Sequence, residues 1–167
     1  MSRNDNRAPP QHSSADLITQ DPSAFAAAVP AGTTLLALDV SRKRIGVAGC
    51  DAERRLVTPL LTVERKGRGS DLRRLGEIVR QRRVGGFVLG HPVNMDGTLH
   101  DQDEAIRGFA RILVEHFGLP VLLQDERLTS FAVEAAIEEG RVAAKPGEPV
   151  DHLAAAVILE DALRAMS

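Results

Sequence analysis

The sequence predicts an α/β protein built on a five-stranded mixed sheet with helices on both faces. Three short apolar runs follow one another closely between residues 34 and 63, as in an antiparallel meander. After residue 70, stretches with helical spacing alternate with short apolar runs, a pattern typical of parallel β-α-β units. Together these observations predict the strand order 3-2-1-4-5, with strands numbered along the chain.

The meander consists of expected strands at about 34–39, 44–49 and 56–63, and the short turn "VSRK" joins the first two. Before it, "DPSAFAAAVPAG" predicts a short helix, because Asp21 can cap the helix and Pro22 suits its first position. The first twenty residues are polar and contain paired prolines. We therefore expect a disordered tail at 1–20, followed by a single domain at 21–167.

In the second half, "SDLRRLGEIVRQRR" places its leucines and its isoleucine on one helical face, with Ser70 as the expected cap. Helical spacing recurs at 101–118, which ends with Gly118. Two further helices are expected at about 129–139 and 150–166. The buried strand "VGGFVLG" lies between the helix that starts at Ser70 and the helix at 101–118, and the buried strand "PVLLQ" follows the latter. Both should run parallel to the first strand.

The composition excludes several protein classes. The chain has 167 residues, enough for one domain with its own core. Its single cysteine, Cys50, excludes a disulfide framework and a cysteine-rich zinc site, and is expected to be a small buried side chain. No apolar run approaches the roughly 20 residues of a membrane span. We therefore expect a soluble, cytoplasmic protein that has no contact with membranes.

The charge is distributed unevenly along the chain. The net charge is -2, but residues 42–83 hold thirteen Lys or Arg against five acids, giving +8 there and -10 elsewhere. A basic surface attracts phosphates, while acids gathered elsewhere can bind metal ions. The same composition is also typical of a solvated helix face rich in arginine.

Four acids fall at positions where ligand sites form. Asp39 ends the first strand, Asp125 and Glu126 end the last, and Asp151 lies in the first turn of the final helix. The carboxyl ends of parallel strands meet at one edge of the sheet. Each acid alone could cap a helix or close a turn, but three carboxylates together repel one another unless a cation neutralises them. We therefore expect a metal site drawn from these acids.

The chemistry of the expected ligands narrows the choice of metal. Oxygen ligands without Cys or His favour magnesium or manganese. Two such ions about 4 Å apart would activate a water for phosphodiester cleavage. Nearby, the turn "GHPVNMDG" could offer backbone N–H groups and the Asn94 amide to a phosphate, although turn chemistry alone also selects such residues. His91 could carry protons, but a lone loop histidine is more often incidental.

Four stretches carry a resemblance to a known family: "LLALDVSRKRIGVAGCD", "VLGHPVNMDGTLHDQ", "LLQDERLTSFAVEAAI" and "PVDHLAAAVILEDAL". Over about residues 33–165 they resemble the RuvX family, also called YqgF. Its members are ribonuclease-H-like relatives of the RuvC resolvases, described as Holliday junction resolvases or as nucleases that process the precursor of 16S ribosomal RNA. The resemblance implies a ribonuclease-H-like fold and a metal-dependent nuclease with two magnesium or manganese ions.

By this resemblance the catalytic and metal-binding acids are Asp39, Glu126 and Asp151. Glu126 is preferred to Asp125 because neighbouring strand residues face opposite ways and the longer side chain reaches farther. The residues expected to contact nucleic acid are Lys43, Arg44, Asn94 and Arg127. The chain departs from the family at Ser41-Arg42, where a glycine-threonine turn is usual, and at His91, where leucine is usual.

Two other functions compete with a nuclease. Sugar kinases and actin-like ATPases share this kind of sheet, but they need two such domains and a second glycine-rich phosphate loop. A non-catalytic nucleic-acid-binding module in ribosome maturation or transcription has no need of a repulsive acid cluster. Branched DNA and ribosomal RNA precursor are both open as substrates, and both a monomer and a homodimer are compatible with the sequence.

Overall fold

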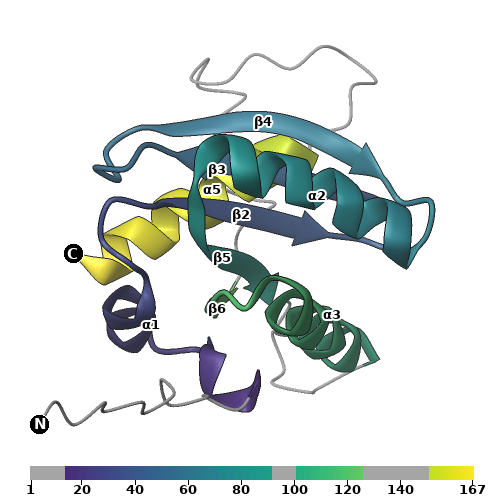
Figure 1. Cartoon of the computed structure of the whole chain (residues 1–167), viewed down its shortest axis with the longest axis horizontal. Coiled ribbons are helices and arrows are strands. Elements are labelled where there is room, and N and C mark those ends of the chain that lie inside the picture. The colour runs from purple at the N-terminus through teal and green to yellow at the C-terminus, as the bar shows by residue number, and fades with distance from the viewer. Residues whose placement is uncertain (1–13, 92–100, 126–150) are drawn as a thin grey trace, which may run out of the picture.

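The computed structural model describes residues 14–91, 101–125 and 151–167, which form a mixed sheet with helices on both faces (Figure 1). The strands are β1 (Ile18–Thr19), β2 (Thr34–Val40), β3 (Arg44–Cys50), β4 (Val57–Glu64), β5 (Val84–His91) and β6 (Val121–Asp125). The helices are the 3-10 turn η1 (Ser14–Leu17), α1 (Pro22–Ala28), α2 (Arg68–Arg82), α3 (Asp101–Phe117) and α5 (Asp151–Met166). The helix predicted at 129–139 lies outside the described residues.

The order of strands across the sheet is β1-β6-β5-β2-β3-β4. Strand β3 pairs antiparallel with both β2 and β4, whereas β5 pairs parallel with both β2 and β6. The five predicted strands therefore lie in the predicted order, and the mixed sheet is confirmed. As a result, β2, β4, β5 and β6 all end at the same edge of the sheet, called here the carboxyl edge.

The sheet has a sixth strand that the sequence did not predict. Strand β1 pairs parallel with β6, with Ile18 opposite Val121 and Thr19 opposite Leu122. It lies in the segment 1–20 expected to be a disordered tail, so that expectation is wrong for residues 14–19. The physical reason is that β1 satisfies the backbone groups on the open edge of β6, while Leu17 and Ile18 pack against the core. Residues 1–13 lie outside the described residues.

The two faces of the sheet pack against different helices, which lie in front of and behind the sheet in Figure 1. Leu36 and Leu38 belong to the core under α2 and α3. Leu35 and Ala37 belong to the core shared with α1 and α5. Because side chains alternate along a strand, Asp39 lies on the α5 face. Among the described helices, none has the length and apolar character that crossing a membrane requires.

The hairpin between β2 and β3 closes as predicted. The Ser41 backbone N–H donates to the Arg44 carbonyl at 2.8 Å, and the Ser41 hydroxyl accepts from the Arg44 N–H at 3.1 Å. Helix α2, however, begins at Arg68, two residues before the predicted cap Ser70. Its cap is Gly67, whose φ of 135° suits a residue without a Cβ. The start of α2 thus lies beside the hairpin at the carboxyl edge.

Candidate active site

Asp39 and Asp151 come together because a glycine lets helix α5 approach the sheet. Asp39 is in register with Gly46 of β3, and the Asp151 backbone lies directly over that glycine. A Cβ at position 46 would lie 1.9 Å from the Asp151 carbonyl oxygen, so no larger residue fits without a shift of the backbone. Gly46 therefore lets the first turn of α5 lie directly above β3, next to Asp39 on β2.

A second contact holds the same turn of α5. His152 Nδ1 lies 3.1 Å from the hydroxyl of Thr62. Thr62 is in register with Gly46, so Asp39, Gly46 and Thr62 form one row across β2, β3 and β4. The first turn of α5 rests on this row. The sheet register and the helix packing thus bring together two acids that are far apart in the sequence.

The two acids have different electrostatic environments. Burial, followed by the negative charge of Asp151, raises the pKa of Asp39 from 3.8 to about 6. Arg44 Nε lies 3.2 Å from Asp151 Oδ2 and balances that carboxylate. Asp39 has no ion pair with any other residue in the described part of the chain. Among the described residues, the site therefore holds a carboxyl group at the sheet edge that no cation compensates.

These residues fit a hard divalent cation. Two neighbouring carboxylates, one of them with a raised pKa, are a donor set that magnesium or manganese would neutralise. Within residues 14–91, 101–125 and 151–167, no group of three His, Cys, Asp or Glu side chains could hold a metal ion. The predicted third ligand, Glu126, lies outside these ranges.

The other predicted site residues are only partly described. Glu126, Arg127 and Asn94 lie outside the described residues. Lys43 is exposed at the tip of the hairpin, while Arg44 is engaged with Asp151. The alternative acid, Asp125, is the last residue of β6 and is exposed. The face of the sheet to which it belongs follows from the alternation of side chains along β6.

The alternation in β6 separates Asp125 from Asp39. Leu123 packs in the core under α2 and α3, while Leu122 packs in the core shared with α5. Asp125 lies two residues after Leu123 and therefore belongs to the α2 and α3 face. Asp39 belongs to the opposite, α5 face.

His91 has a defined structural role that the sequence did not indicate. It is 4% exposed, and its Nε2 atom hydrogen-bonds to Asp103 in the first turn of α3. Arg107 Nε lies 3.1 Å from the other carboxylate oxygen of Asp103. The hydrogen bond from His91, aided by Arg107, lowers the pKa of Asp103. This cluster ties the end of β5 to the start of α3; only the i,i+4 spacing of Asp103 and Arg107 could have hinted at it.

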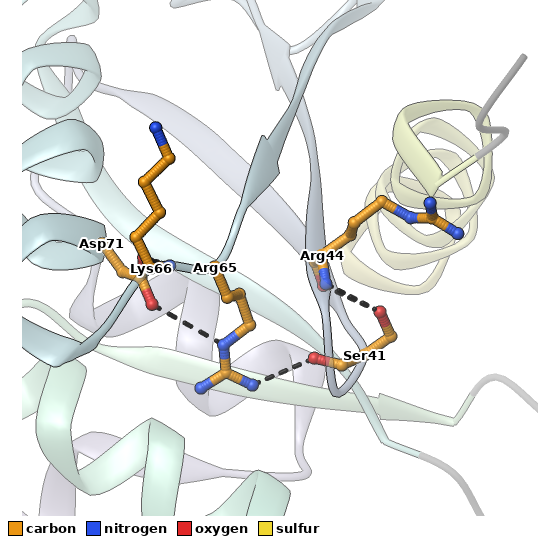
Figure 2. Close-up of polar contacts among 5 residues, drawn as sticks. All are labelled: Ser41, Arg44, Arg65, Lys66 and Asp71. Carbon is orange, nitrogen blue, oxygen red and sulfur yellow. Dashed lines mark hydrogen bonds and ion pairs between the residues drawn. The ribbon is translucent and has the colours of Figure 1, made fainter.

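Arg65 is a second residue that sequence reasoning did not single out. Its Nη1 atom donates to the Ser41 carbonyl at 3.0 Å, and its Nε atom lies 3.7 Å from Asp71 Oδ2 (Figure 2). Its guanidinium also lies 5.6 Å from the centroid of the Phe109 ring. Figure 2 shows Arg44 extending toward α5, away from Arg65. Arg65 is thus held on the α2 and α3 side of the hairpin.

The fold is ribonuclease-H-like and similar to that of RuvC. Two structures of RuvC from Thermus thermophilus are similar to it: one in complex with a Holliday junction substrate, with a TM-score of 0.52, and another with a TM-score of 0.50. The first is 16% identical and the match covers 80% of this chain and 94% of that chain; the second is 15% identical and covers 75% and 92%. At this identity the likeness concerns the fold alone.

Sequence comparison identifies the family. A family model described as "RuvX: Holliday junction resolvase" matches residues 33–165. A protein of Sphingopyxis alaskensis named "Putative pre-16S rRNA nuclease" is 45% identical over 152 residues, covering 90% of this chain and 99% of its own length. A Roseobacter denitrificans protein of the same name is 43% identical over 150 residues, covering 88% and 92%. The chain belongs to the RuvX family.

Proposed function

We propose that this protein is a metal-dependent nuclease that hydrolyses phosphodiester bonds. The observation that carries the proposal is the pairing of Asp39 with Asp151 at the carboxyl edge, where the pKa of Asp39 is raised to about 6. Such a pair is unfavourable in the protein alone, and a binding module gains nothing from it. A cation between the two carboxylates would relieve the repulsion. RuvX membership and the nuclease names of the relatives support the same activity.

Asp39, Asp151 and Glu126 would hold magnesium or manganese, as two ions. Glu126 is preferred to Asp125 because Asp125 belongs to the face of the sheet opposite Asp39. When bound, such ions acidify water and neutralise the charge that develops on the leaving oxygen. Cys50 is buried and therefore unavailable as a nucleophile. Water is accordingly the attacking group.

The chain's own residues orient this chemistry. Arg44 holds the Asp151 carboxylate from the hairpin, and Gly46 holds the backbone of the same residue. Lys43, next to Arg44, would contact a phosphate of the substrate. Asn94 and Arg127 are proposed to contact the nucleic acid as well. Recognition would rest mainly on backbone charge, because the chain has no Trp or Tyr.

The precursor of 16S ribosomal RNA is the favoured substrate, because two relatives that this chain matches over nearly their whole length are named as pre-16S rRNA nucleases. Branched DNA is the alternative substrate, since the family model is described as a Holliday junction resolvase. A ribosomal RNA substrate would place the protein in the cytoplasm.

A cleavage assay on both substrates tests the proposal. The parent should cut one of them with magnesium or manganese and should fail with calcium, whose looser coordination aligns the reacting oxygens poorly. The Asp39→Asn protein should lose cleavage by orders of magnitude while keeping most of its affinity. Asp161→Asn, in the last turns of α5, is the matched control and should cut normally. Equal cleavage by the parent and by Asp39→Asn protein free of host nucleases would refute the mechanism.

A further inference from the structure

A second feature of the carboxyl edge is a pocket on the face of the sheet covered by α2 and α3. The pocket has a volume of about 1100 Å³ and borders Asp39. This is slightly above the range for sites of small molecules, about 300–1,000 Å³. Its walls come from the β2–β3 hairpin, the start of α2 and one side of α3. The pocket therefore shares Asp39 with the paired acids, whereas Asp151 is not among the described residues that line it.

Three arginines surround this pocket: Arg42, Arg65 and Arg68. Arg42 and Arg68 are exposed, and neither forms an ion pair with another described residue. Guanidinium groups left without a carboxylate beside a pocket are typical partners of phosphate, which they bind in a planar, two-pronged geometry. The pocket therefore favours a ligand with a phosphate group.

Arg65 differs from these two because its guanidinium is already held in place. Asp71, the Ser41 carbonyl and the ring of Phe109 contact it from different directions. Asp71 is itself 4% exposed and accepts a hydrogen bond from the Lys66 backbone N–H at 3.0 Å (Figure 2). A guanidinium plane fixed in this way can stack against an unpaired base without losing side-chain freedom on binding.

Besides the arginines, the wall has the polar residues Asp39, Ser41 and Asp71 and an apolar part. Leu72 of α2 and Ile106, Phe109 and Ile112 of α3 belong to the apolar part. An inorganic phosphate would gain nothing from these side chains, whereas a nucleotide base would bury its faces against them. The combination of arginines and an apolar wall thus fits a whole nucleotide.

We propose that this pocket binds one unpaired nucleotide of the substrate strand, next to the phosphodiester held at Asp39 and Asp151. The base lies against Arg65 and the apolar wall, and its phosphate meets Arg42 and Arg68. The inference rests on the proposed function in that it takes the ligand to be the nuclease substrate. It adds a preference for a substrate that is single-stranded beside the cleavage position.

Filling the pocket tests the proposal most directly. Ala105 lines the pocket from an exposed position on α3, so Ala105→Leu would occupy the space and keep a good helix former. All binding is measured in the Asp39→Asn background with EDTA, so that cleavage plays no part. Affinity for a hairpin RNA with a single-stranded flank should fall at least about tenfold, as for the loss of one stacked base. Affinity for a fully paired RNA of equal length should stay unchanged.

Two arginine variants separate charge from stacking. Arg65→Lys keeps the charge but removes the plane, so it should weaken binding of the flanked RNA and leave the salt dependence unchanged. Arg68→Gln should reduce the slope of log affinity against log salt by about 1. Arg55→Gln, at the opposite edge of the sheet, removes the same charge and should leave the affinity almost unchanged.

Each result decides the proposal. Parental affinity of both Ala105→Leu and Arg65→Lys for the flanked RNA would overturn it, and so would an equal loss for the paired RNA. A third result would also overturn it: a nucleoside monophosphate binds the parent but not Ala105→Leu, while both proteins bind the flanked RNA equally well. The pocket would then bind a free nucleotide and not part of the substrate strand. If the parent cuts no substrate but the predicted binding losses appear, the nuclease function fails and the nucleotide pocket stands.

Discussion

Replacing Asp39 by Asn should stabilise the metal-free protein at neutral and alkaline pH, although it removes a residue of the proposed site. Burial and the charge of Asp151 raise the pKa of Asp39 from 3.8 to about 6 in the folded protein. In the unfolded chain the pKa returns to about 3.9. The folded state therefore binds a proton that the unfolded state has already released, and the stability gained from this proton is lost as the pH rises.

The size of the change in the free energy of unfolding follows from the pKa shift of Asp39. Each unit of pKa difference corresponds to about 1.4 kcal/mol, so a difference of about two units removes about 3 kcal/mol from the free energy of unfolding. The loss begins near pH 4 and is complete above about pH 6. Asn carries no charge at any of these pH values and escapes the loss. Asp39→Asn should thus gain up to about 3 kcal/mol over the parent near pH 8, and almost nothing near pH 4.

Urea unfolding followed by far-ultraviolet circular dichroism, with EDTA present, measures this difference; the chain has no Trp or Tyr for fluorescence. Asp51→Asn is the control, because the pKa of Asp51 is shifted in the opposite direction from that of Asp39. Backbone N–H groups of Arg55 and Leu56 lower the pKa of Asp51, so its contribution is present at neutral pH and disappears in acid. An Asp39→Asn protein that is no more stable than the parent near pH 8, or equally stabilised near pH 4, would refute the electrostatic argument.

Two further predictions concern the supports of the site. Gly46→Ala should lift the first turn of α5, because its Cβ would lie 1.9 Å from the Asp151 carbonyl oxygen. Unfolding experiments should show a loss of about 1–3 kcal/mol, and cleavage should fall although both acids remain; normal cleavage would contradict the role given to this contact. Asp103→Asn removes a charged hydrogen bond from His91, and should cost about 1.5–3 kcal/mol at neutral pH. Because the pKa of Asp103 is lowered, the difference from the parent should shrink below about pH 4, and an undiminished difference in acid unfolding curves would count against the pair.

The sequence predicted the architecture well where its periodicity was strong. The meander and the later alternation of helices and strands were sufficient for the order of the five long strands, because each strand is a bounded apolar run. The proximity of Asp39 and Asp151 was also foreseen, since one ends a strand and the other begins a helix. Strand β1 was missed because two residues carry no periodicity, and only the open edge of β6 makes them a strand.

Contacts that depend on three-dimensional packing could not be predicted. Residue type favours Ser70 as the cap of α2, but the helix is capped earlier, at Gly67, where φ is 135°. In the sequence, Arg65 is one of thirteen basic residues between 42 and 83, and nothing distinguishes it from the others. Its partners Asp71 and Phe109 lie on two different helices. The sequence gives no signal for the role of His91, since its partner Asp103 belongs to another element. Long-range partners of this kind have no periodic signal in a single sequence.

The contact between Gly46 and the start of α5 also sets the order of events during synthesis. Strands β2 to β5 and helix α2 end by residue 91, so the ribosome releases most of the sheet well before Asp151 emerges. Until that residue leaves the exit tunnel, Asp39 lacks the second carboxylate with which it would hold a cation. A nascent chain would therefore carry the sheet but not the acid pair. For an enzyme proposed to cut RNA of the translation machinery, activity would begin only after the ribosome has synthesised α5.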